Sequence, residues 1–183
     1  MLYTGKGDEG TTKTFGCDQR ISKSSSVAEA LGTLDEINSF LGLCKVKSGE
    51  HNFTFEEKSF SSIVHTVQSN LFIVQAELAG APKEISKEKV KEIEDIINNI
   101  EKELPPITSF FISGGSEVAA LFDVARTLAR RAERRVVGVC EEHNNCVGTH
   151  TRAYMNRLSS LLYALARYAN YLAGEKEEAP DYK

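Results

Sequence analysis

Five arginines lie within ten residues of the segment R126-T-L-A-R-R-A-E-R-R135, although the chain has a formal net charge of -4. On a helix, three of these arginines and one glutamate share a face and lie about one turn apart: Arg126, Arg130, Glu133 and Arg134. We call this set the arginine face; Arg131 and Arg135 point elsewhere. Like charges at this spacing repel each other, and guanidinium groups bind phosphate oxygens in a bidentate manner. The segment therefore indicates a polyphosphate site or, alternatively, a solvated basic surface with ion pairs.

The N-terminal stretch T4-G-K-G-D-E-G-T-T12 contains the residue types of a phosphate-binding loop. Backbone N–H groups freed by glycine can bind phosphate, Lys6 can neutralise its charge, and Asp8 can hold a magnesium ion. The order of residues is neither that of a Walker A motif nor that of a G-x-G-x-x-G dinucleotide-binding turn. A flexible terminus is the alternative interpretation of this stretch.

Two further polar residues are candidates because of their helical surroundings. The last apolar-patterned segment has one polar face, with Asn156, Ser160, Tyr163 and Arg167. The amide of Asn156 suits contacts to a nucleotide, and a plain surface residue is equally compatible with its position. Asp35 lies at the edge of an apolar stripe, where burial of a carboxylate requires a partner. We expect an arginine of segment 126–135 to be that partner.

Composition restricts the class of protein. A chain of 183 residues, with 41% hydrophobic and 26% charged residues, fits one globular domain. Its acidic balance argues against a nucleic-acid-binding protein that relies on bulk electrostatics. No apolar run is long enough for a membrane span or an export signal, so we expect a cytoplasmic protein without membrane contact. The cysteines form no C-x-x-C pair, and we expect reduced thiols at Cys17, Cys44, Cys140 and Cys146.

Apolar residues recur with the helical period in five segments, at about residues 26–46, 54–79, 87–104, 117–141 and 151–174. The second segment is expected to begin at Thr54, which has Glu57 three residues later in a capping-box pattern. The first 25 residues lack this period and are expected to form an irregular loop. The sequence thus predicts an all-α, up-and-down bundle of five helices in a single domain. Its parts are the loop 1–25, the bundle 26–174 and a tail 175–183.

Together and in this order, the motifs resemble those of the PduO-type ATP:cob(I)alamin adenosyltransferases. The matching stretches are Y3-T-G-K-G-D-E-G-T-T12, E29-A-L-G-T-L-D-E36, P105-P-I-T-S-F110, S113-G-G115, R130-R-A-E-R-R135, N156-R-L-S159 and L165-A-R-Y168. The resemblance implies a homotrimer that binds ATP, with Mg2+, between subunits. It also implies transfer of the 5′-deoxyadenosyl group of ATP to cob(I)alamin or another reduced corrinoid, giving adenosylcobalamin and triphosphate. The implied partners are a cob(II)alamin reductase and an adenosylcobalamin-dependent enzyme.

The same resemblance implies roles for individual residues. The implied nucleotide-binding residues are Thr4, Gly5, Lys6, Gly7, Thr12, Lys23, Arg130, Arg131, Glu133, Arg134 and Asn156. Asp35 is implied to pair with Arg126 across the subunit interface, and Phe110 to form the apolar wall below the corrin. With Arg130, these three residues make up the implied catalytic set, and no residue is implied to ligate a metal held by the protein alone.

The chain departs from the family pattern at three places. Lys6 stands where the family commonly has Thr, and a cation there still suits phosphate. Ser160 stands where the family often has Asp, so any contact of that carboxylate is lost. The loop after Phe110 lacks a proline often found before the serine, here Ser113, and we expect a different shape for this loop.

Other functions stay open at this point. A non-catalytic nucleotide- or corrinoid-binding bundle is the main alternative, and it would bind ATP without making triphosphate. A zinc site is a second alternative, because Cys140, His143, Cys146 and His150 are spaced as C-x2-H-x2-C-x3-H, although this is not a standard finger. A di-iron bundle is disfavoured because the sequence has no Glu-x-x-His motif.

Overall fold

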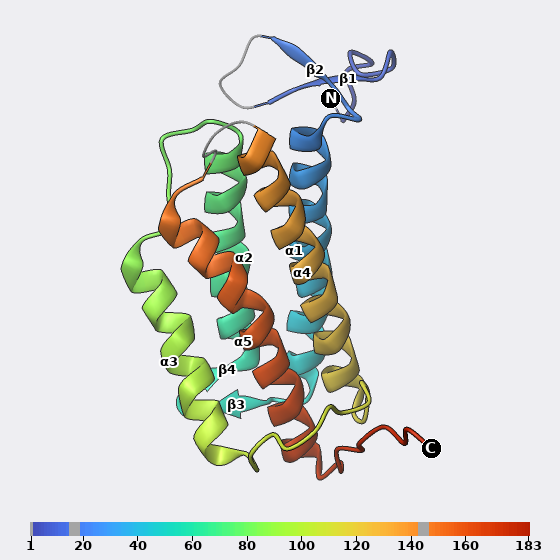
Figure 1. The fold of residues 1–183 in the computed structure, drawn as a ribbon, viewed down its shortest axis with the longest axis vertical. Helices are drawn as coiled ribbons and strands as arrows, with labels where there is room; N and C mark the ends of the chain where they lie inside the picture. Colours follow the sequence, from blue (N-terminus) through green and yellow to red (C-terminus); the bar gives the residue numbers. More distant parts are fainter. Residues whose placement is uncertain (1, 15–18, 143–146) are drawn as a thin grey trace.

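The computed structural model of the chain describes residues 2–14, 19–142 and 147–183. Within these ranges the chain forms five α-helices: α1 (Ser26–Glu50), α2 (Phe60–Leu78), α3 (Lys87–Glu103), α4 (Glu117–Glu142) and α5 (Thr149–Ala173). Successive helices run in opposite directions along the long axis of the molecule (Figure 1). The all-α, up-and-down bundle expected from the apolar period is therefore confirmed.

The helices pack around one hydrophobic core. Helix α4 packs against both α1 and α5, α1 also packs against α2, and α3 packs against α5. Phe60 at the start of α2 and Phe122 of α4 are fully buried, with ring centroids 5.8 Å apart in an edge-to-face arrangement. Tyr154 and a row of leucines from α5 complete the same core. This packing fixes α4 beside α5, and the two helices carry Arg126, Arg130, Glu133, Arg134 and Asn156 of the predicted site.

Helix α2 begins later than predicted, because a short hairpin precedes it. The strands Thr54–Phe55 (β3) and Lys58–Ser59 (β4) pair antiparallel, and Glu56 between them has φ +52°. Ser59 caps the helix, since its Oγ accepts a hydrogen bond of 3.1 Å from the N–H of Ser62. The prediction of a capping box at Thr54 is wrong. Two-residue strands show no periodicity that could have revealed the hairpin in the sequence.

The N-terminal segment is also more ordered than predicted. The strands Thr11–Lys13 (β1) and Arg20–Ser22 (β2) form an antiparallel pair just before α1. This hairpin lies beyond one end of the bundle (Figure 1). The connection from α3 to α4, residues 105–116, lies at the opposite end, next to the C-terminal segment 175–183. We call residues 105–116 the cavity loop.

The described cysteines, Cys44 and Cys140, differ in their oxidation state. Cys44 is a free thiol in the core, and burial raises its pKa to about 12. Cys140 is disulfide-bonded, so the expectation of a reduced thiol is wrong for this residue. The spacing of cysteines in a sequence does not report the geometry that brings two sulfur atoms together. Cys17 and Cys146 lie outside the described residues. Across the described ranges, no helix combines the length and the apolar character that a bilayer span requires.

Candidate active site

A cavity of about 580 Å³ lies between the cavity loop, α4 and α5. Its lining residues are Ile107, Thr108, Ser109, Phe110, Phe111, Arg126, Arg130, Ser159, Ser160 and Tyr163. The volume is in the range of small-molecule binding sites. Phe110 is 80% exposed, so its ring does not belong to the core and is available to a ligand. The cavity therefore joins an apolar wall from the loop to two guanidinium groups from α4.

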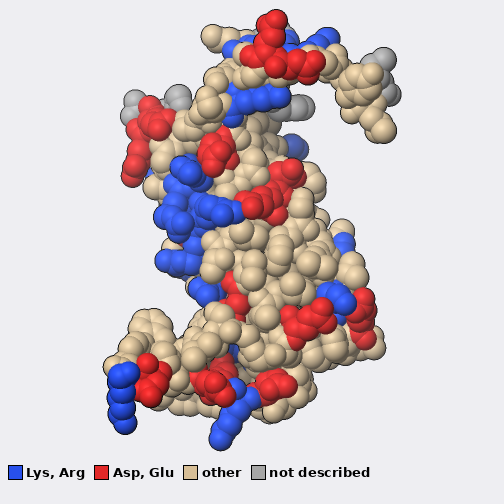
Figure 2. All heavy atoms as spheres, turned by 90° about the vertical axis from the view of Figure 1, so that its right-hand side faces the viewer, with Lys and Arg blue, Asp and Glu red and all other residues tan. Residues whose placement is uncertain are grey.

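The arginines of α4 fall into two groups according to their partners. Arg131 forms an ion pair with Glu36, and Arg135 one of 3.5 Å with Glu29, so both lie against α1. Arg130 and Arg134 are exposed and make no hydrogen bond or ion pair with the described residues. Figure 2 shows Lys and Arg side chains gathered in a column on the face formed by α1 and α4, with acidic side chains beside it. The predicted orientation of Arg131 and Arg135 away from the arginine face is confirmed, and on that face Arg130 and Arg134 are the residues suited to bind an anion.

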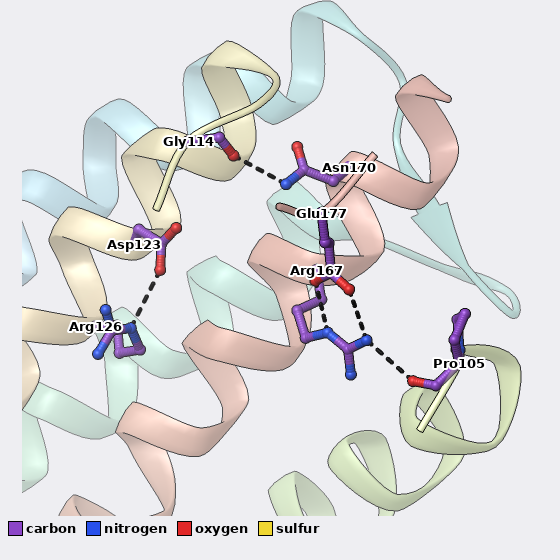
Figure 3. Close-up of polar contacts among 7 residues, drawn as sticks. All are labelled: Pro105, Gly114, Asp123, Arg126, Arg167, Asn170 and Glu177. Atoms are coloured by element: carbon purple, nitrogen blue, oxygen red, sulfur yellow. Dashed lines mark hydrogen bonds and ion pairs between the residues drawn. The ribbon is translucent and has the colours of Figure 1, made fainter. Parts of the chain in front are cut away.

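Arg126 is held within its own helix. Its Nε donates a hydrogen bond of 3.2 Å to Oδ1 of Asp123 (Figure 3). Its guanidinium lies 5.8 Å from the ring centroid of Tyr163. Burial raises the pKa of Tyr163 and outweighs the opposing effect of Arg167, so this phenol stays neutral at physiological pH. The contacts fix Arg126 at the side of the cavity.

Asn156 lies on α5, directly across from the arginine face. Its Nδ2 donates a hydrogen bond of 2.9 Å to Oε1 of Glu133, and its Oδ1 accepts one of 2.7 Å from Arg157. The structure thus brings together Asn156 and Glu133, two of the predicted nucleotide-binding residues. Neither lines the cavity described above. They mark a polar seam between α4 and α5.

The N-terminal candidates are organised around Arg20. Its guanidinium donates hydrogen bonds to the carbonyl oxygens of Lys6, at 2.5 Å, and Thr11, at 2.7 Å. Gly7 packs closely against the side chain of Lys23, and a Cβ at Gly7 would lie 3.0 Å from Nζ of this lysine. Thr12 pairs with Ile21 in the hairpin. These contacts order the loop and leave the ammonium groups of Lys6 and Lys23 without an ion pair among the described residues.

Asp35 does not behave as expected within the protomer. It is exposed and makes no hydrogen bond or ion pair with any described residue. The arginines of α4 pair with its neighbours Glu29 and Glu36 instead, because these two carboxylates project toward α4. Within the described chain no arginine of α4 pairs with Asp35, and its expected pairing with Arg126 of another copy stays a prediction.

The cavity loop is anchored at both ends by α5, which the sequence did not indicate. Arg167 is only 5% exposed and binds both carboxylate oxygens of Glu177, each at 2.7 Å, and the carbonyl oxygen of Pro105 at 3.0 Å. Asn170 donates to the carbonyl oxygen of Gly114 at 2.9 Å and accepts from the N–H of Ser116 at 2.9 Å. Figure 3 shows the contacts of Arg167 with Glu177 and Pro105 and that of Asn170 with Gly114. The sequence indicates Arg167 only as part of a polar face, and no local pattern points to Glu177.

The predicted site residues do not form one cluster within a single protomer. Phe110, Arg126 and Arg130 meet at the cavity. Thr4, Gly5, Lys6 and Gly7 belong to the hairpin region at the other end of the bundle (Figure 1). Nothing among the described residues groups three or more His, Cys, Asp or Glu side chains as metal ligands. Two of the four proposed zinc ligands, His143 and Cys146, lie outside the described residues, and a disulfide-bonded Cys140 offers no thiolate.

The cavity joins an apolar wall from the loop to Arg130, an arginine without a partner among the described residues, so this helical bundle suits the binding of an anionic group and an apolar group side by side. The cobalamin adenosyltransferase family matches residues 2–169, and the chain belongs to this family. The corrinoid adenosyltransferase PduO of Salmonella typhimurium is 40% identical over 173 residues, which cover 91% of this chain and 48% of that protein. The chain therefore spans about half the length of this relative.

Two other comparisons cover most of this chain and most of the protein to which it is matched. The corrinoid adenosyltransferase of Bacillus subtilis is 35% identical over 178 residues, with 94% of this chain and 88% of that protein covered. A solved structure of a variant PduO-type ATP:corrinoid adenosyltransferase from Lactobacillus reuteri superposes with a TM-score of 0.87 at 28% identity. It covers 100% of this chain and 97% of its own, and that protein is complexed with cobalamin and ATP.

Proposed function

We propose that this chain transfers the 5′-deoxyadenosyl group of ATP to cob(I)alamin or a related reduced corrinoid. The observation that carries the proposal is the meeting of Phe110 with Arg126 and Arg130 in one cavity. An apolar wall suits the flat face of a corrin, and guanidinium groups suit the departing triphosphate. Membership in the cobalamin adenosyltransferase family supports the same assignment.

The proposed reaction needs little chemistry from the protein. The cobalt(I) of the substrate attacks the 5′ carbon of ATP, a cobalt–carbon bond forms, and the carbon–oxygen bond to the triphosphate breaks. Triphosphate leaves with the electron pair of that bond. Cobalt(I) is itself the nucleophile, so the chain has to align the two substrates and stabilise the charge of the leaving group. Phe110 would exclude water from the lower face of the corrin.

We further propose that each nucleotide site is shared between two copies of the chain in a homotrimer. The support is that the segment around β1 and β2, which includes Lys6, Gly7 and Lys23, lies at the end of the bundle opposite the cavity loop (Figure 1). The α4 residues Arg130 and Arg134 have no described partner in their own protomer. A loop supplied by a neighbouring copy would complete the phosphate-binding surface and relieve the repulsion along the arginine face.

Magnesium belongs to the proposal as a companion of the phosphates. The described residues do not provide a set of three acidic, His or Cys ligands, so they do not fit a metal held by the protein alone, and we assign no step to it. A cytoplasmic location, a cob(II)alamin reductase and an adenosylcobalamin-dependent partner enzyme stay predictions of the sequence.

The test is anaerobic incubation of the chain with ATP and chemically reduced cobalamin. Formation of a cobalt–carbon bond, followed by absorbance, together with release of triphosphate would support the proposal. Binding of ATP and corrinoid without triphosphate would favour the non-catalytic alternative.

A further inference from the structure

The contact between Arg167 and Glu177 connects the C-terminal segment to the cavity loop. Arg167 lies on α5, and its guanidinium is almost completely removed from water. A buried charge is costly unless it is paired and its hydrogen-bonding groups are satisfied. Glu177 supplies the countercharge through two hydrogen bonds of 2.7 Å, and this contact raises the pKa of Arg167. Glu177 is therefore the residue that allows a cation to remain at this position.

The same guanidinium holds the start of the cavity loop. It donates to the carbonyl oxygen of Pro105 at 3.0 Å and lies 5.3 Å from the ring centroid of Phe111. The next residue of the loop is attached to the C-terminal segment, because the N–H of Ile112 donates to the carbonyl oxygen of Glu178 at 2.8 Å. Phe110, by contrast, is exposed, and its position follows from these neighbours.

The C-terminal segment reaches the loop because of how α5 ends. Gly174 adopts φ +72°, a left-handed conformation that glycine accepts without strain, and the N–H of Glu175 then bonds to the carbonyl oxygen of Asn170 at 2.9 Å. This turn sends the chain back toward the cavity loop. Figure 3 shows the carboxylate of Glu177 meeting Arg167 on the side that faces Pro105.

We propose that Glu177 is a positioning residue for the corrinoid: by pairing with Arg167 it fixes the cavity loop, and so the wall formed by Phe110, in the arrangement that receives the corrin. This inference rests on the proposed function for its substrate. Loss of the carboxylate leaves Arg167 without its countercharge and frees the Pro105 end of the loop. The corrinoid then meets a mobile wall, whereas Arg130 and the N-terminal loop, which make no hydrogen bond or ion pair with Arg167 or Glu177, keep their surroundings.

The experiment compares Glu177→Gln with the matched control Glu178→Gln. The control removes the same charge from the neighbouring residue, whose side chain is exposed and has no described partner. We expect Glu177→Gln to raise the KM for cob(I)alamin about fivefold or more and to leave the KM for ATP within about twofold, because a charge-assisted contact is lost only at the loop. Glu178→Gln should leave both values unchanged. If Glu177→Gln does not fold, Glu177→Asp, which keeps the charge on a shorter side chain, takes its place.

A second measurement does not depend on the reaction. The chain has no tryptophan, so Phe110→Trp introduces a single fluorescent reporter at the tip of the loop. Adding Glu177→Gln to this variant should lower the fluorescence anisotropy of the tryptophan, and adding Glu178→Gln should not. Equal effects of the two substitutions on the anisotropy, or a changed anisotropy with an unchanged corrinoid KM, would overturn the proposal. If the unsubstituted chain transfers no adenosyl group, the proposed function fails, and the anisotropy alone decides whether Glu177 fixes the loop.

Discussion

Arg130 and Arg135 belong to the same helix and have different surroundings. Arg135 pairs with Glu29 at 3.5 Å, whereas Arg130 lines the cavity and has no partner among the described residues. An exposed ion pair such as that of Arg135 contributes at most about 1 kcal/mol to stability. An unpaired arginine at a cavity contributes little to folding. Its free guanidinium is better explained by an anionic ligand.

For this reason we predict that Arg130→Ala raises the KM for ATP about tenfold or more, or abolishes turnover, because a bidentate contact to phosphate is lost. The free energy of unfolding should change by less than about 0.5 kcal/mol, as for other exposed positions. Steady-state kinetics and urea denaturation measure the two effects. Arg135→Ala is the control and should keep the KM for ATP. Equal kinetics of the two variants would remove Arg130 from the site.

Phe110 permits a second test at the level of one side chain. We predict that Phe110→Ala slows adenosylation more when the reaction starts from cob(II)alamin and a reductant than when it starts from cob(I)alamin. The expected reason is that water reaches the lower face of the corrin once the apolar wall is gone. The KM for ATP should stay within about twofold, since the phosphate contacts are unchanged.

The matched control for this substitution is Phe72→Ala. Phe72 is 62% exposed on α2, outside the lining of the cavity. Its removal should therefore change the rate of adenosylation neither from cob(II)alamin nor from cob(I)alamin. A loss of ATP affinity in Phe110→Ala, without an effect on the cobalt(II) reaction, would contradict the role of the wall.

At the scale of the elements, the start of α2 distinguishes the structure from the sequence pattern. Ser59 caps the helix through a hydrogen bond of 3.1 Å, whereas Thr54 lies in β3. We predict that Ser59→Ala lowers the free energy of unfolding by about 1 kcal/mol, the usual cost of removing such a cap. Thr54→Ala should cost less than about 0.5 kcal/mol. Urea denaturation of the two variants decides whether Ser59 or Thr54 caps α2. A larger loss of unfolding free energy for Thr54→Ala would favour the capping box.

The helices were predictable from the sequence because an apolar residue on every turn is a local signal, and each helix buries such a stripe. The same geometry separated Arg131 and Arg135 from the arginine face, and the structure confirms this separation. The anchoring of the cavity loop was not predictable. Arg167 and Glu177 are joined by a turn at Gly174 and by burial, and Pro105 is 62 residues away from Arg167 in the sequence. Pairings of this kind depend on packing, which no short pattern reports.

At the scale of the whole molecule, the two phosphate-binding candidates lie apart. The hairpin region with Lys6 lies at one end of the bundle, and the cavity loop lies at the other (Figure 1). Each site is proposed to combine the N-terminal loop of one copy with α4 of the next. A mixed trimer of chains altered in the loop and chains altered in α4 then contains some sites in which both elements are intact. If the site lies within one protomer, every site of such a trimer carries one of the two substitutions, and no activity is restored.

We therefore predict that Lys6→Ala and Arg130→Ala chains, each inactive or weak alone, regain activity when they are refolded together. Random mixing restores about a quarter of the sites, because each site needs an intact loop from one variant and an intact helix from the other. The transfer assay measures the recovery, and light scattering verifies the trimer. A mixture of Arg130→Ala with Arg134→Ala is the control, and it should recover nothing because both changes affect α4. No recovery in the first mixture would argue for a site within one protomer.

The position of Glu177 after all five helices has a consequence for synthesis on the ribosome. The cavity loop is made about sixty residues before Glu177, so it lacks this anchor until α5 and the segment after it have been synthesised. The wall of the cavity is then completed only after residue 177 has been translated. A nascent chain released early would hold its helices together and yet lack a receptive surface for the corrin.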